Sequence, residues 1–175
     1  MALYEGENQK QKASLNSNKR FLVPGKNLRL IAERIQRDDL LCKLLTRYDS
    51  EVLNDKVKPT LKERGAVLQD KVRTIPVLEK DEDTGAYIIL NVGTVTTMSA
   101  GLSYNISFDI LCNTDIWELD GYNTRPLYIM NQLDYLFSDT KVDGIGKMVF
   151  LGAVPLKVNE KMLGYTMLFN IGEIG

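Results

Sequence analysis

Residues 104–110 alternate strictly between apolar and polar side chains, and this pattern constrains the fold more than any other part of the sequence. The apolar members are Tyr104, Ile106, Phe108 and Ile110, and the polar ones are Asn105, Ser107 and Asp109. Successive side chains of a strand point to opposite faces, so the segment is predicted to be a strand with one covered face. The nearly continuous apolar run at 86–92 is typical of a central strand covered on both faces.

Helical spacing and short apolar runs predict the remaining elements. Apolar residues recur at helical spacing over 28–47, where Asp38 and Asp39 interrupt the stripe and favour two short helices or one kinked helix. A second helix is expected at 126–138, after a Thr124 cap. Short strands are expected at 74–78, 147–151 and 163–171. The order α-β-β-β-α-β-β predicts an α+β fold, with a single antiparallel or mixed β-sheet of about five strands and helices packed on one face.

The chain divides into an arm and one domain. Residues 1–26 are polar and lack an apolar period, which predicts a flexible or extended N-terminal arm with a break at Pro24-Gly25. Residues 27–175 are expected to form a single α+β domain, with Asn27 as the first helix cap. Within it, 49–73 is predicted to be a long connection with a possible short helix after Pro59, and 93–102 a hairpin tip or projecting loop. The first residues do not resemble a signal peptide, and no apolar run approaches the ~18 residues that a membrane span needs.

The composition argues against most catalytic chemistry. The sequence has no histidine and only two cysteines, Cys42 and Cys112, which we expect to be buried and reduced. Gly144-Ile145-Gly146-Lys147 lacks the spacing of a phosphate-binding loop and is expected to be a tight turn. We therefore predict no catalytic residue, cofactor or metal ion, and no enzyme activity. The alternative from another class is a small metal-dependent nuclease that uses Asp109 and nearby acids.

Charge is distributed unevenly along the chain. Residues 1–73 contain 16 Lys and Arg and 10 Asp and Glu, a balance of +6, whereas residues 74–175 contain 6 and 13, a balance of −7. Such asymmetry fits a basic arm that meets nucleic acid or an acidic partner. It also fits head-to-tail packing of subunits, or simply solvated faces without a partner.

Several segments together resemble the neck proteins of tailed bacteriophages, in particular the tail-terminator or tail-completion family. The segments are 39–45, 108–112 with Trp117, Arg125-Pro126 with Asp134, 144–153 and 163–169, and the resemblance spans about 27–171. It implies a structural virion protein, assembled in the host cytoplasm, that forms a hexameric or dodecameric ring at the head–tail neck. The ring would contact the tail tube and the portal-side connector, with DNA passing through its lumen and making at most non-specific contacts. A head-completion or connector ring next to the portal is the closest alternative.

Three regions are the candidates for subunit or partner contacts. The candidate residues are Lys19, Arg20 and Phe21 in the arm, Lys56, Lys58, Lys62, Arg64 and Arg73 in the connection, and Thr94, Thr96, Thr97 and Met98 in the hydroxyl-rich segment. A third reading is a cytoplasmic regulator that binds its partner through the helix at 126–138. That reading requires an exposed apolar helix face, and we expect this face to be buried.

Overall fold

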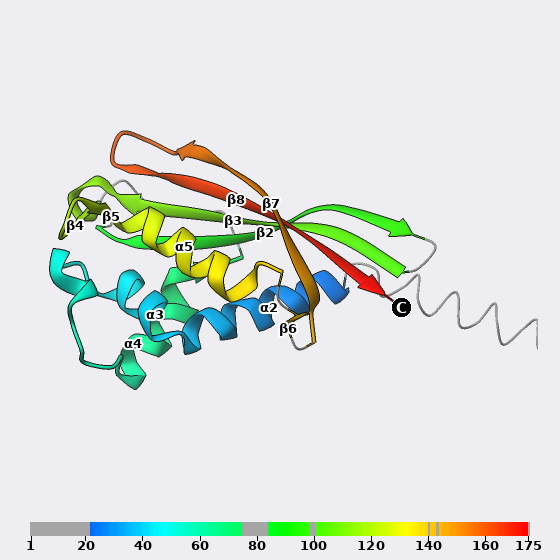
Figure 1. Cartoon of the computed structure of the whole chain (residues 1–175), viewed down its shortest axis with the longest axis horizontal. Helices are drawn as coiled ribbons and strands as arrows, with labels where there is room; N and C mark the ends of the chain where they lie inside the picture. The colour runs from blue at the N-terminus through cyan, green and yellow to red at the C-terminus, as the bar shows by residue number, and fades with distance from the viewer. Residues whose placement is uncertain (1–21, 75–83, 99–100, 140, 143, 175) are drawn as a thin grey trace, which may run out of the picture.

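The computed structural model describes residues 22–74, 84–98, 101–139, 141–142 and 144–174 (Figure 1). Within these residues the main sheet has six strands in the order β1-β2-β3-β8-β7-β6. Their bounds are Val72–Arg73 for β1, Ala86–Met98 for β2, Gly101–Asn113 for β3, Lys141–Val142 for β6, Gly146–Lys157 for β7 and Met162–Ile174 for β8. β1 pairs in parallel with β2, and the other neighbours are antiparallel. The predicted α+β class with a mixed sheet is confirmed.

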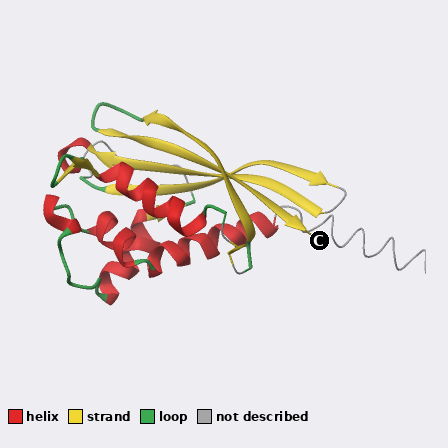
Figure 2. Cartoon of the chain, viewed as in Figure 1, coloured by secondary structure: helices red, strands yellow, loops and turns green. Residues whose placement is uncertain are grey.

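The helices lie together against one face of the sheet (Figure 2). They are α2 (Leu22–Arg37), α3 (Asp39–Thr46), α4 (Leu61–Ala66) and α5 (Arg125–Phe137). The described residues also form three shorter helical turns, η1 (Ser50–Leu53), η2 (Val67–Lys71) and η3 (Thr114–Ile116). A small two-stranded sheet of β4 (Glu118–Leu119) and β5 (Asn123–Thr124) precedes α5. We call the sheet side that carries the helices the inner face and the opposite side the outer face.

The core fills the space between the helices and the inner face. The apolar members of the alternating segment in β3 are fully buried, as the period predicts. Phe108 of β3 contacts Phe137 of α5 and Phe169 of β8, with ring centroids 5.6 and 5.1 Å apart. The apolar side of α5 is buried through Ile129, Leu133 and Phe137, so the expected burial of this helix is confirmed.

The first helical region differs from its prediction at its start. Two helices form, and Asp38 separates them because its Oδ1 accepts a hydrogen bond from the Leu41 amide at 2.8 Å, as an N-cap does. However, α2 begins at Leu22, so Pro24-Gly25 lies in its first turn and is not a break. Asn27 is no cap either, since it is buried and its Nδ2 donates to the Tyr104 hydroxyl. The arm predicted over 1–26 thus overlaps the helix at 22–26, and residues 1–21 lie outside the described part.

The connection predicted over 49–73 contains η1, α4, η2 and β1. The short helix expected after Pro59 is present, and Thr60 and Glu63 form a reciprocal capping box at its start. Of the strand predicted at 74–78, only Thr74 lies within the described residues, and β1 ends just before it.

The long strands extend well beyond their apolar cores. Residues 93–98 belong to β2 and 101–102 to β3, so the expected loop at 93–102 is the far end of a long hairpin. The strand register shifts between Val92 and Val95, which marks a bulge. The hydroxyl-rich sequence beyond this bulge lacks an apolar period, and for this reason the strand could not be predicted there.

Candidate functional site

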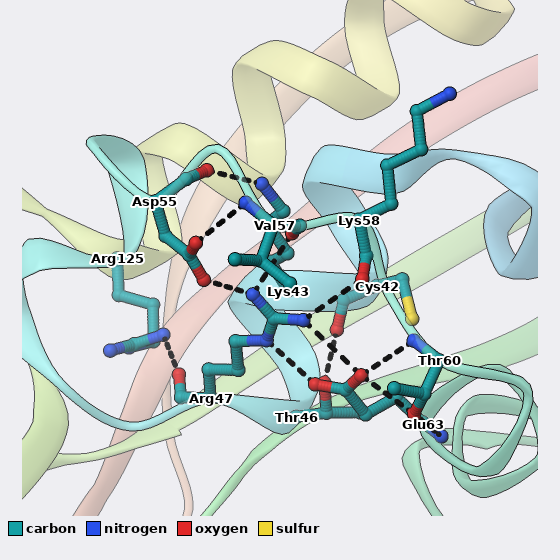
Figure 3. Close-up of polar contacts among 10 residues, drawn as sticks. All are labelled: Cys42, Lys43, Thr46, Arg47, Asp55, Val57, Lys58, Thr60, Glu63 and Arg125. Atoms are coloured by element: carbon teal, nitrogen blue, oxygen red, sulfur yellow. Dashed lines mark hydrogen bonds and ion pairs between the residues drawn. The ribbon is translucent and has the colours of Figure 1, made fainter.

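Arg47 is the centre of a polar network that fixes the lysine-bearing connection between α3 and α4 (Figure 3). Its Nε donates to Glu63 Oε1 at 2.6 Å and its Nη2 to Glu63 Oε2 at 3.2 Å. Its Nη1 donates to Asp55 and, at 3.1 Å, to the Val57 carbonyl oxygen. The backbone that carries Lys56 and Lys58 is therefore held from both sides, while both lysine side chains are exposed.

The same contacts set the electrostatics of this connection. The hydrogen bond from Arg47 lowers the pKa of Glu63 to about 2. A hydrogen bond from the Val57 amide, at 2.7 Å, lowers the pKa of Asp55, with Arg47 contributing further. Both carboxylates stay ionised through the physiological range and more than offset the single positive charge of Arg47. The exposed positive charge of this connection therefore comes from its lysines.

Arg125 joins the start of α5 to the end of α3. Its side chain is fully buried and donates to four backbone carbonyl oxygens, those of Ile116 at 2.9 Å, Leu44 at 2.9 Å, Arg47 at 2.8 Å and Asp49 at 2.9 Å. Burial lowers its pKa, and the carbonyl oxygens at the negative end of α3 compensate the buried charge. Sequence reasoning noted Arg125 only as the start of a helix, because nothing local in the sequence indicates these contacts.

The predicted contact residues divide into exposed and structural ones. Lys56, Lys58 and Lys62 are exposed. By contrast, Arg64 is half-buried, pairs with Asp39 and donates to the Gln36 carbonyl oxygen at 2.7 Å. These three lysines remain candidates for partner contacts, whereas Arg64 holds α4 against α2.

The remaining predicted contact residues are Arg73 and those of the hydroxyl-rich segment. Arg73 donates to the Asp70 carbonyl oxygen at 2.8 Å and lies over the ring of Tyr87 at 4.8 Å. Thr94, Thr96, Thr97 and Met98 lie in β2 toward the far end of the hairpin, and the three threonines are exposed. This hairpin end and the lysine-bearing connection are at opposite ends of the long axis (Figure 1). Lys19, Arg20 and Phe21 lie outside the described residues, so the structure brings no two of the three predicted regions together.

Asp109, the residue of the nuclease alternative, connects three strands on the outer face. Its carboxylate accepts hydrogen bonds from Asn91 Nδ2 at 2.9 Å and from Thr166 Oγ1 at 2.7 Å. Across the described ranges, no group of three or more His, Cys, Asp or Glu side chains is placed to hold a metal ion.

The other sequence motifs have structural roles. Cys42 and Cys112 are buried, as expected, and burial raises the pKa of Cys112 to about 12. Gly144 and Gly146 have φ values of 78° and 102° and form the turn into β7, which agrees with the tight turn predicted for the glycine motif. In the described part of the chain, no helix is both long enough and apolar enough to cross a membrane.

Comparison with models of known protein families identifies a related family. The family model YomW matches residues 38–171. The chain belongs to the YomW family. This family is named after a gene product of the Bacillus phage SPbeta region, which indicates a phage-related protein. The YomW match begins at Asp38, the cap of α3, and ends at Ile171 in β8, so it covers α3, α5 and the long strands but not α2. No curated protein matches the chain.

Proposed function

We propose that this protein is a structural virion protein of a tailed phage, a ring-forming tail terminator at the head–tail neck. In this role the ring joins the tail to the head connector, and DNA passes through its lumen. The observation that carries the proposal is the YomW match over most of the chain, which indicates phage origin, together with the resemblance of 27–171 to neck proteins. The protein would act by assembly alone, without catalysis.

The distribution of exposed contact candidates supports this proposal. A neck ring must contact neighbouring subunits and, on separate surfaces, the tail tube and the head connector. The exposed lysines 56, 58 and 62 and the exposed threonines of β2 lie at opposite ends of the molecule (Figure 1). Because Arg47 fixes the backbone around Lys56 and Lys58, binding through these lysines would require little ordering of the backbone. Lysines at this end suit an acidic neighbour or the DNA backbone.

The solution mass of the purified protein tests the ring. Light scattering over a wide range of concentrations should give a hexameric or dodecameric species of the 19.8 kDa chain. A monomer at every concentration would contradict a self-assembling ring.

Electron microscopy of particles from a phage that lacks this protein tests the location. We expect unattached heads and tails, because the joining ring is absent. Normally joined particles would refute the neck role. If tails complete normally and only the heads leak DNA, the protein instead belongs to a head-completion ring next to the portal.

A further inference from the structure

Strand β7 exposes apolar side chains near the edge that is not paired with β8. Val149, Leu151 and Val154 have 39%, 52% and 60% of their surface exposed. β7 pairs with β8 along its length, but on its other side the described residues supply only β6, opposite Gly146 and Lys147, and a bridge from Ser138 to Met148. From Val149 to Lys157, no other described strand pairs with this edge. We call Val149, Leu151 and Val154 the β7 patch.

Strand pairing places the two valines of the β7 patch on the outer face. Val149 pairs with Asn170 and Val154 with Thr166 across β8. Thr166 bonds Asp109 on the outer face, whereas the intervening Met167 and Phe169 are buried in the core. Val149 and Val154 therefore point away from the helices, and the exposed Leu151 lies between them in the chain, at a bulge between Phe150 and Gly152.

The backbone of β7 is unsuited to pairing with a further strand. The bulge breaks the regular spacing of its edge amides. Pro155, four residues after Leu151, has no amide hydrogen to donate. Bulges and prolines are devices that block strand addition at sheet edges. A partner at this edge must therefore pack on the side chains.

The charges beside the β7 patch disfavour contact with the same patch of another copy. Residues 146–161 contain Lys147, Lys157 and Lys161 and a single acid, Glu160. Two such surfaces placed face to face would offer Lys157 and Lys161 of each copy only Glu160 as an acidic partner from within 146–161. Lys147 pairs with Asp139 of its own chain at 3.0 Å, so Lys157 and Lys161 supply the remaining positive charge.

The exposed side of α5 combines apolar side chains with acids, whereas the β7 patch combines them with lysines. Leu127 and Tyr135 are exposed, the latter at 75%, and lie two helical turns apart on the same side of the helix. Three exposed acids are near this helix, with Asp134 on α5 itself and Glu118 and Asp120 in the β4–β5 hairpin that leads into it. The one basic residue within 118–139, Arg125, is fully buried, and Asp139 is paired with Lys147. We call Leu127 and Tyr135 with these three exposed acids the α5 patch. The α5 helix belongs to the layer on the inner face of the sheet (Figure 2), whereas Val149 and Val154 of the β7 patch are on the outer face.

We propose that the β7 patch of one copy packs on the α5 patch of the next copy. The apolar side chains supply the buried area, and Lys157 and Lys161 meet the acids around α5. Because the two patches differ, the contact is heterologous, and such contacts generate closed rings when the rotation closes. This inference rests on the proposed ring function and names the surfaces that would build it.

Mixing two assembly-defective variants tests this contact. Val154→Asp blocks the β7 patch and Tyr135→Asp blocks the α5 patch, and each variant alone should lose all species above the monomer. Mixed in equal amounts, they should form a dimer of twice the monomer mass, because one intact patch remains on each chain. Leu22→Asp is the matched control, since Leu22 at the start of α2 is 69% exposed and lies outside both patches, and it should assemble like the wild type.

The outcomes separate this contact from the proposed function. Circular dichroism and the thermal midpoint should show that the variants remain folded, since the substituted side chains are exposed. If the wild type assembles and either Asp variant assembles equally well, the contact is wrong while the ring stands. A mixture that remains monomeric overturns the heterologous contact as well. A wild type that never assembles overturns both the ring and the contact.

Discussion

Arg125 connects segments that lie about 80 positions apart in the sequence. Its guanidinium group is fully buried and is satisfied by backbone carbonyl oxygens from the end of α3, from Asp49 and from η3. Its loss would leave these carbonyl oxygens without a donor in a largely dry environment. A buried polar group without a partner costs about 1–3 kcal/mol.

Arg125→Met should therefore lower the free energy of unfolding by at least about 3 kcal/mol, because more than one buried carbonyl loses its donor. For a chain of this size, that corresponds to a fall in the thermal midpoint of roughly 6–12 °C. Urea unfolding followed by circular dichroism measures the change. Arg29→Met is the control, since the Arg29 side chain is 83% exposed and should change stability little. Equal effects of the two substitutions would contradict the role of Arg125.

Glu63 makes the stability of the connection dependent on pH. Its pKa falls from 4.5 to about 2 in the folded protein, chiefly because Arg47 donates a hydrogen bond to it. A lowered folded-state pKa contributes stability that is present above about 4.5 and is lost as the pH falls toward 2. The wild type should therefore lose stability over this range more steeply than Glu63→Gln in pH-dependent urea unfolding. Glu51→Gln, at an exposed position in η1, should follow the wild type; a Glu63→Gln profile as steep as the wild type would show that Glu63 contributes nothing.

At the scale of elements, β8 leaves no room for a side chain where Gly164 faces β3. A Cβ atom at Gly164 would lie 1.8 Å from the Ile110 carbonyl oxygen and 3.2 Å from the Leu111 Cα atom. These are backbone atoms of a central strand, which cannot rotate away. Gly172, further along β8, has no atom within 4 Å of the same position. Packing therefore requires a glycine at position 164 of β8 but not at position 172.

Gly164→Ala should lower the free energy of unfolding by about 3 kcal/mol or more, since overpacking against the backbone forces the strands apart. Gly172→Ala is the matched control in the same strand and should be close to neutral. Thermal unfolding of the two variants measures the difference. A Gly164→Ala protein as stable as the Gly172→Ala protein would show that β3 and β8 are not this close.

At the scale of the whole molecule, the fold redistributes the charge asymmetry of the sequence. Several basic residues of the first half pair within it, as Arg47 does with Asp55 and Glu63 and Arg64 with Asp39. The exposed charges that matter for the proposed contact instead belong to the second half of the sequence. There, Lys157 and Lys161 lie beside the β7 patch, and Asp134 lies on the helix that carries the α5 patch.

The proposed ring should therefore weaken as NaCl is raised from about 0.1 M to 1 M, because the screening length falls from about 10 Å to 3 Å. Sedimentation at several salt concentrations measures the shift toward smaller species. Replacing both Lys157 and Lys161 by Gln should reduce this salt dependence, whereas Lys26→Gln, at an exposed position in α2, should leave it unchanged. Salt dependence that is equal in all three proteins would mean that the two lysines do not face acids across the contact.

The sequence by itself determined the fold class and the elements whose side chains follow a clear period. The alternation of residues 104–110, the apolar side of α5 and the Asp38 cap all act within a few residues, so local patterns predict them. The buried cysteines and the glycine turn before β7 could be predicted for the same reason. Lys56, Lys58 and Lys62 are exposed, and they lie in a segment that the sequence shows to be charged and without a clear apolar period.

Only the tertiary structure decided the features that depend on distant contacts. Asn27 lies inside α2 and donates a hydrogen bond to the Tyr104 hydroxyl, 77 positions away, although its local sequence favours a cap. Arg64 and Arg125 are structural because of partners more than 20 positions away. The β7 and α5 patches were missed because an apolar run in the sequence does not reveal which side chains a neighbouring element covers. Burial depends on contacts between elements of the packed chain, whereas the spacing of residues in the sequence indicates only which side of one element they share.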